Sequence, residues 1–178
     1  MTKVKIDKEI LNAIAPCSMF CITCTGCQYG QISDHARKLL HLLEGHEEFL
    51  DKNLLKEYRH KLDEFKIFYK KLNKYAYPKC GGCRNNKANG CSIKRCIIPE
   101  CTKKHHVDFC AQCSEFPCDN VNESIYKKTT IEKWLKGNTL IKKIGIEKYF
   151  ENNKNIPHYI NYAKIEKKQN EGDYNENN

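Results

Sequence analysis

The fold of this chain is decided by residues 80–118, which read CGGCRNNKANGCSIKRCIIPECTKKHHVDFCAQCSEFPC. Apolar residues in this segment follow neither the helical nor the strand period, so burial alone gives it little reason to order. Eight cysteines fall within it: Cys80, Cys83, Cys91, Cys96, Cys101, Cys110, Cys113 and Cys118. Ordering a backbone costs about 1–2 kcal/mol per residue, and we expect cross-links through these cysteines to offset that cost.

Two pairs of these cysteines have the spacing of metal-binding knuckles. Cys80-Gly-Gly-Cys83 and Cys110-Ala-Gln-Cys113 each leave two residues between the cysteines, which lets a tight turn direct both sulfurs at one ion. Eight thiols suffice for two tetrahedral zinc sites. The order of the cysteines leaves their division open. One partition joins Cys80 and Cys83 to Cys110 and Cys113, and the other is sequential, Cys80/Cys83/Cys91/Cys96 and Cys101/Cys110/Cys113/Cys118.

Another cysteine block lies nearer the N-terminus, in residues 17–27, and consists of Cys17, Cys21, Cys24 and Cys27. Its first three members have the spacing that radical S-adenosylmethionine enzymes use for an iron–sulfur cluster. Those enzymes leave one iron of the cluster without a protein ligand, whereas Cys27 would bind that iron here. They also need several strand–helix units, and this chain favours helices without strands. We expect zinc at these four cysteines. The alternative is a closed [4Fe–4S] cluster held by the same four, because the last three of them follow the ferredoxin spacing.

Composition favours metal thiolates over disulfides. Among the 178 residues, the first 16 contain no apolar run of a secretory signal, and no segment approaches 18 consecutive apolar residues. We therefore expect a cytoplasmic protein without a membrane span, whose twelve cysteines meet a reducing compartment. The formal net charge is +9. Three four-cysteine zinc sites at about −2 each would reduce it to roughly +3, so charge alone argues weakly for nucleic acid.

The remainder of the chain predicts helices. Ser33 is the expected N-cap of a helix over 34–44 that stops at Gly45, and a second amphipathic helix is expected from 47 or 51 to 74, closed by Pro78. Two further helices are expected over 122–135 and 140–150, separated at Gly137. The sequence thus predicts a small, mainly α, cysteine-rich domain, with metal-thiolate knuckles packed against a helical hairpin and C-terminal helices. We expect a single domain over residues 1–150. Within it, 17–27 is the first cysteine cluster, 33–75 the helical hairpin, 80–118 the second cysteine cluster and 122–150 the C-terminal helices. Residues 151–178 form a polar tail, which we expect to be disordered from 169.

The sequence shows no catalytic motif. It contains no G-x-S-x-G, phosphate-binding loop, G-x-G-x-x-G or H-E-x-x-H, and twelve cysteines in groups of four leave no spare thiol as a nucleophile. His105 and His106 are weaker substitutes for a cysteine ligand. We expect a structural or interaction module rather than an enzyme, with a protein partner favoured over nucleic acid. The nucleic-acid alternative rests on four tyrosines that stand among lysines, Tyr58, Tyr69, Tyr75 and Tyr77. Most of these tyrosines lie on the apolar face of the expected second helix.

Several motifs resemble those of a bacterial and archaeal family grouped as domain of unknown function 3795. They are Cys17-x3-Cys21-x2-Cys24 after Ala15-Pro16, Cys80-Gly-Gly-Cys83, Cys91-x4-Cys96, the stretch 109–118 (FCAQCSEFPC) and the stretch 141–147 (IKKIGIE). The resemblance covers residues 11–150. Ser18 stands where the family usually has glycine, and Cys27 is additional. The resemblance implies a cysteine-rich, zinc-binding protein without an assigned activity.

Overall fold

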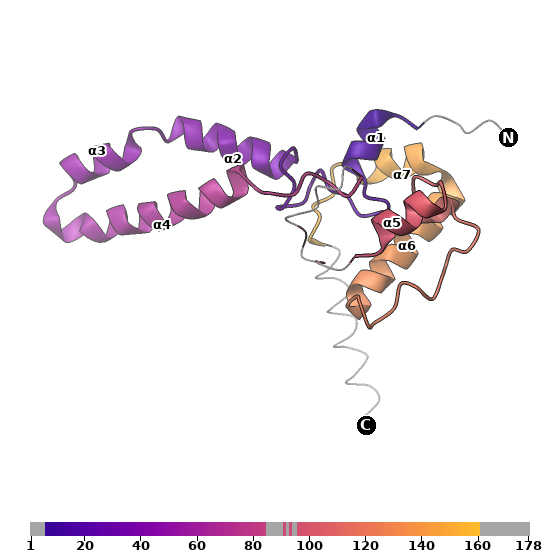
Figure 1. The fold of residues 1–178 in the computed structure, drawn as a ribbon. Helices are drawn as coiled ribbons and strands as arrows, with labels where there is room; N and C mark the ends of the chain where they lie inside the picture. The colour runs from indigo at the N-terminus through magenta and orange to yellow at the C-terminus, as the bar shows by residue number, and fades with distance from the viewer. Residues whose placement is uncertain (1–5, 85–90, 92, 94–95, 161–178) are drawn as a thin grey trace, which may run out of the picture.

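A computed structural model describes residues 6–84, 91, 93 and 96–160 of the chain (Figure 1). In these residues the regular elements are helices, and β-pairing is limited to isolated bridges. The prediction of a mainly α fold is therefore confirmed. None of the helices in the described ranges is long and apolar enough to cross a membrane. The predicted disorder of residues 169–178 lies outside the described residues.

A helical arm projects from the rest of the molecule (Figure 1). It is formed by α2 (Gln31–Leu42), α3 (His46–Asn53), the short 3-10 helix η1 (Lys56–Tyr58) and α4 (Arg59–Ala76). Helices α2 and α4 run side by side, and their buried contact consists of Ala36, Leu40, Leu72 and Ala76. We call residues 31–77 the arm and the other described residues the body.

The structure corrects two predictions about the arm. Ser33 is not the N-cap, because α2 begins at Gln31 and the buried Ser33 hydroxyl instead donates to the carbonyls of Gly30 and Gln28. The second helix is also not continuous, since the chain becomes extended at Leu54 before α4 begins. The Asn53 side chain bonds the Phe49 carbonyl, a local contact that competes with further helix.

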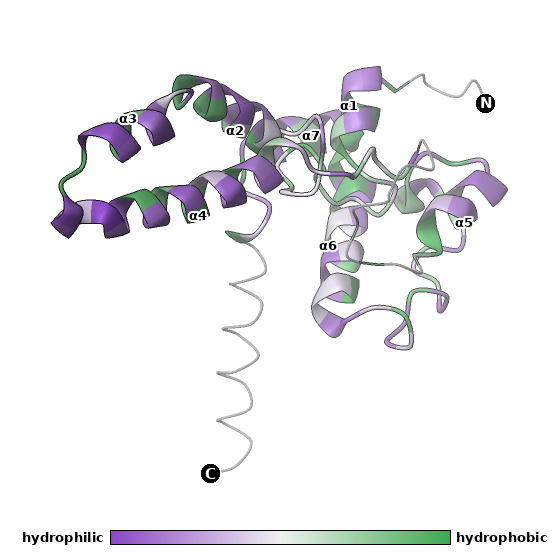
Figure 2. Cartoon of the chain, turned by 60° about the vertical axis from the view of Figure 1, so that its left-hand side comes forward, coloured by the Kyte–Doolittle hydropathy of each residue, from purple (hydrophilic) through white to green (hydrophobic). Residues whose placement is uncertain are grey.

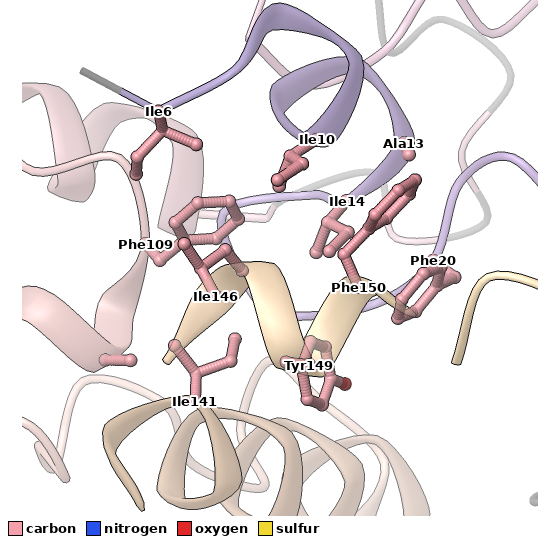
Figure 3. Close-up of a cluster of buried hydrophobic side chains, with 11 residues drawn as sticks. Ile6, Ile10, Ala13, Ile14, Phe20, Phe109, Ile141, Ile146, Tyr149 and Phe150 are labelled. Atoms are coloured by element: carbon pink, nitrogen blue, oxygen red, sulfur yellow. The ribbon is translucent and has the colours of Figure 1, made fainter. Parts of the chain in front are cut away.

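The body is built around α1 (Lys8–Ala13), α6 (Lys128–Ile144) and α7 (Ile146–Asn153), with α5 (Ile98–Lys104) and the 3-10 turn η2 (Cys110–Gln112) alongside. Figure 3 shows the larger apolar cluster, where side chains from α1, α6 and α7 meet. Its buried members are Ile6, Ile10, Ala13, Ile14, Phe20, Phe109, Ala111, Ile141, Ile146, Tyr149 and Phe150. Helix α1 was not predicted, and it closes this cluster from one side.

Helix α6 passes through Gly137, where the sequence predicted a break. Gly137 is needed for close packing, because a Cβ there would lie 2.2 Å from the Ser18 hydroxyl. The neighbouring Asn138 is fully buried and donates to the Cys17 carbonyl and the Ser18 hydroxyl, and it accepts from the backbone N–H of Ala111. Helix α6 ends instead at Gly145, which has a positive φ of 83°. Ser18 also has a positive φ, of 72°, a conformation that glycine adopts more readily than other residues.

Residues 80–118 have more apolar anchoring than their sequence pattern predicts. Ile98, Phe109 and Phe116 are buried. A second apolar cluster joins this segment to α6 and to the loop before it, through Ile98, Cys110, Phe116, Val121, Tyr126 and Trp134. Cross-links are therefore not the only source of order that this segment has.

Candidate metal centres

All twelve cysteines are free thiols, and the structure gathers them into two sets. The four-cysteine set is Cys101, Cys110, Cys113 and Cys118. The eight-cysteine set is Cys17, Cys21, Cys24, Cys27, Cys80, Cys83, Cys91 and Cys96, linked by the mutual effects of the thiols on one another's pKa values. The first cysteine block thus lies near four cysteines of the second block, Cys80, Cys83, Cys91 and Cys96, at the base of the arm.

The four-cysteine set lines one small cavity of about 20 Å³, the size of a single water molecule. Cys101 comes from α5, and the tight turn of η2 supplies Cys110 and Cys113, with a backbone bond of 3.0 Å from Cys113 N–H to the Cys110 carbonyl. The remaining lining residues include His105, Phe116 and Trp134. Cysteines from three separate turns of chain therefore face one space.

The surroundings of this cavity keep the Cys110 thiol neutral unless something replaces its proton. Burial is the main cause that raises the pKa of Cys110 to about 11, and negative charge on the other three cysteines acts in the same direction. The buried indole N–H of Trp134 has no hydrogen-bond partner in the described structure, yet its proximity to Cys110 lowers the pKa of that thiol. A thiolate at Cys110 is the acceptor that this N–H lacks, so the cavity suits a deprotonated sulfur.

The eight-cysteine set lies where the chain enters and leaves the arm. Cys27 and Cys80 form an isolated parallel bridge, with N–H to carbonyl distances of 3.1 Å from Gln28 to Cys80 and from Cys80 to Gly26. This backbone pairing brings the two cysteine blocks together.

Burial is also the main cause that raises the thiol pKa values in this set. It raises the pKa of Cys17 and Cys21 strongly and that of Cys83 to about 12, and charges on neighbouring cysteines add to each shift. Arg84 acts in the opposite direction, since its positive charge lowers the pKa of Cys83. Its guanidinium is fixed by the carbonyls of Leu11, Ile14 and Asp108.

Several hydrogen-bond donors point at sulfur atoms of this set. The Gly26 N–H lies 3.4 Å from the Cys24 Sγ, and the Tyr126 hydroxyl donates to the Cys96 Sγ at 3.4 Å. The Tyr159 hydroxyl lies 3.6 Å from the Cys24 Sγ and also contacts Thr25. Such donors stabilise thiolates, as outer-shell partners do in metal sites. Sequence reasoning missed Tyr126, Tyr159 and Trp134, because no spacing relates them to the cysteines.

In the conformation described, the sulfurs are not arranged as ligands. Among residues 6–84, 91, 93 and 96–160, no three cysteine, histidine, aspartate or glutamate side chains are positioned to hold an ion. His105 lines the four-cysteine cavity, and its Nδ1 lies 3.8 Å from a carboxylate oxygen of Glu115. The Nδ1 of His158 lies 2.8 Å from the Phe20 carbonyl oxygen.

Comparison with known protein families matches residues 13–123 of the chain to the family described as Protein of unknown function (DUF3795). This range covers more than half of the chain and contains all twelve cysteines. The chain belongs to the DUF3795 family. The comparisons with curated proteins and with solved structures returned no match. The resemblance inferred from the sequence is confirmed, and the DUF3795 match ends before α6, which supplies Trp134 and Asn138 to the cysteine region.

Proposed function

We propose that this protein is a zinc-binding structural and interaction module, with its twelve cysteines as the metal ligands. The observation that carries the proposal is the cavity lined by Cys101, Cys110, Cys113 and Cys118. Four sulfurs around a space of water size match the donor set of a structural zinc site, which is closed and tetrahedral. Neutral thiols need not converge, whereas binding an ion would draw them together and release their protons.

The function of such a site is to hold pieces of chain together. Zinc binding by thiolates contributes apparent free energies of about 10–16 kcal/mol near neutral pH. In the four-cysteine set, that energy would fix α5 and the 109–118 segment beside α6. Four protein sulfurs leave no position for a substrate or water, so this site would stabilise structure rather than catalyse a reaction.

The arm is the part of the proposed module that would contact a partner. It exposes aliphatic and aromatic side chains, including Leu42 at 78%, Leu55 at 64% and Phe49 at 59% exposure, and Figure 2 shows hydrophobic residues interspersed along it. Exposed apolar groups of this kind favour a protein partner over nucleic acid. Tyr75 and Tyr77 are also exposed, which keeps nucleic acid as the alternative.

Anaerobic purification followed by elemental analysis and a visible spectrum tests this proposal. We expect a colourless protein with about three zinc ions per chain, one for each group of four cysteines. Such thiolates require a reducing compartment, in keeping with a cytoplasmic location. Iron with acid-labile sulfide would instead support the alternative, a [4Fe–4S] protein of redox or maturation function that uses Cys17, Cys21, Cys24 and Cys27. Less than one zinc per chain, without iron, would contradict both the zinc proposal and the iron–sulfur alternative.

A further inference from the structure

The eight-cysteine set raises a question that the proposed function leaves open, namely which four cysteines share an ion. Division by sequence would give one site to residues 17–27 and another to residues 80–96. The contacts in the structure argue against that division, because each block is spread over two places. The inference below rests on the proposed function and specifies its ligands.

The first place surrounds the backbone bridge. Cys27 and Cys80 are directly paired there, and the Cys27 N–H bonds the Cys24 carbonyl at 3.3 Å. The Gly26 N–H is directed at the Cys24 Sγ in the same turn. On the outer side, Tyr159 contacts Cys24 and Thr25. Cys24, Cys27 and Cys80 thus form one group that draws on both blocks.

The second place lies against the second apolar cluster, where Cys17 and Cys96 both pack. The hydroxyl of Tyr126, a buried member of that cluster, donates to the Cys96 Sγ at 3.4 Å. The carbonyl of Cys17 accepts from Asn138, which anchors this position to α6. Cys17 and Cys96, from the two blocks, therefore belong to a group separate from the bridge.

We propose that the eight cysteines form two cross-braced zinc sites, one that includes Cys24, Cys27 and Cys80 and another that includes Cys17 and Cys96. Each of the two groups contains cysteines from before the arm and from after it.

Cross-bracing would give the arm a closed base. The chain leaves the body after Cys27 and returns at Cys80, so both sites would clamp the entering and returning segments together. Closing this loop through metal would remove conformational freedom from the unfolded chain, as a cross-link does. The orientation of the arm on the body would then depend on metal, whereas the pairing of α2 with α4 would not.

Zinc counts in paired cysteine-to-serine variants test the assignment. Each single variant should lose one of three ions. Two changes in one site should still lose one ion, so C17S/C96S and C27S/C80S should each retain two. Changes in different sites should lose two ions, so C17S/C27S and C80S/C96S should each retain one. C113S, in the four-cysteine set, is the matched control and should lose one ion without altering these pairings.

The pairs separate the competing divisions. Division by block predicts that C17S/C27S loses one ion and C17S/C96S loses two, and that result would overturn cross-bracing while leaving the zinc module intact. Retention of two ions in C80S/C96S would show that Cys80 and Cys96 share one ion, which would also overturn cross-bracing. A wild-type protein without zinc would instead refute the proposed function itself.

A second measurement uses only the wild-type protein and therefore tests the assignment even if the variants fail to fold. Wild-type protein is partly stripped of zinc with a chelator, alkylated, and mapped by mass spectrometry. Cys24, Cys27 and Cys80 should become labelled in the same molecules, separately from Cys17 and Cys96. Joint labelling of all four cysteines of residues 17–27, with those of 80–96 protected, would overturn the proposal.

Discussion

In the arm, two helices of one hairpin meet along a seam of small and aliphatic residues, whereas in the body α6 packs against cysteine-bearing turns from distant parts of the chain. The arm seam consists of Ala36, Leu40, Leu72 and Ala76. In the body, Asn138 bonds the carbonyl of Cys17, 121 residues away in the sequence. Pairing of segments close in the sequence costs less loop-closure entropy than pairing of distant segments. Under the proposed function, the body is therefore the part that should depend on metal.

Loss of one ligand from the four-cysteine set should have the largest effect on this contrast. Cys113→Ser should remove close to one zinc per chain and loosen the segment around α5 and η2, because a site of about 10–16 kcal/mol loses a ligand. The arm should keep its helical signal. Limited proteolysis and circular dichroism measure the two responses. Equal protection of residues 96–118 in the variant and the wild type would contradict a structural metal there.

Truncation of the arm seam should have the opposite pattern. Leu72 is 8% exposed and packs in the seam, so Leu72→Ala should destabilise the arm by about 2–5 kcal/mol. Zinc content should not change. Hydrogen exchange of α2 and α4 measures the effect, and Ile67→Ala, on the same helix at 57% exposure, is the control that should change little. Zinc loss in Leu72→Ala would show that arm and body are not independent.

A smaller effect is expected for the polar contact that joins α6 to the first cysteine block. Asn138→Leu leaves the Ala111 N–H without its buried acceptor, which costs about 1–3 kcal/mol. The denaturant midpoint of the body should fall, with arm exchange unchanged. Lys136→Ala, an exposed position of the same helix, serves as the control. An unchanged midpoint in Asn138→Leu would mean that this contact does not brace the body.

The smallest effect concerns acid and the segment after α7. Burial lowers the pKa of His158, helped by the charge of Lys133, while the bond to the Phe20 carbonyl acts in the other direction. The unfolded chain would therefore take up a proton first as the pH falls through about 6.5, and stability from this contact should decline below that value. NMR titration of His158 measures it. A pKa at or above 6.5 in the folded protein would contradict the assignment.

The sequence predicted the helical arm more closely than it predicted which cysteines lie near one another. Leucines and aromatics every three or four residues predict the hairpin because helix pairing follows from local periodicity. The approach of Cys27 to Cys80 depends on how the arm folds back, which no spacing between cysteines encodes. Gly137 was interpreted as a helix break because its role, close contact with Ser18, involves a residue distant in the sequence.

The central claim is that metal holds the body and apolar burial holds the arm, and hydrogen exchange on the zinc-loaded and chelated protein tests it most directly. On chelation at neutral pH, amides of residues 96–118 and of the first cysteine block should lose protection, while those of α2 and α4 should keep most of theirs. The account would be contradicted if the body stayed as protected as before, or if the arm lost protection together with it.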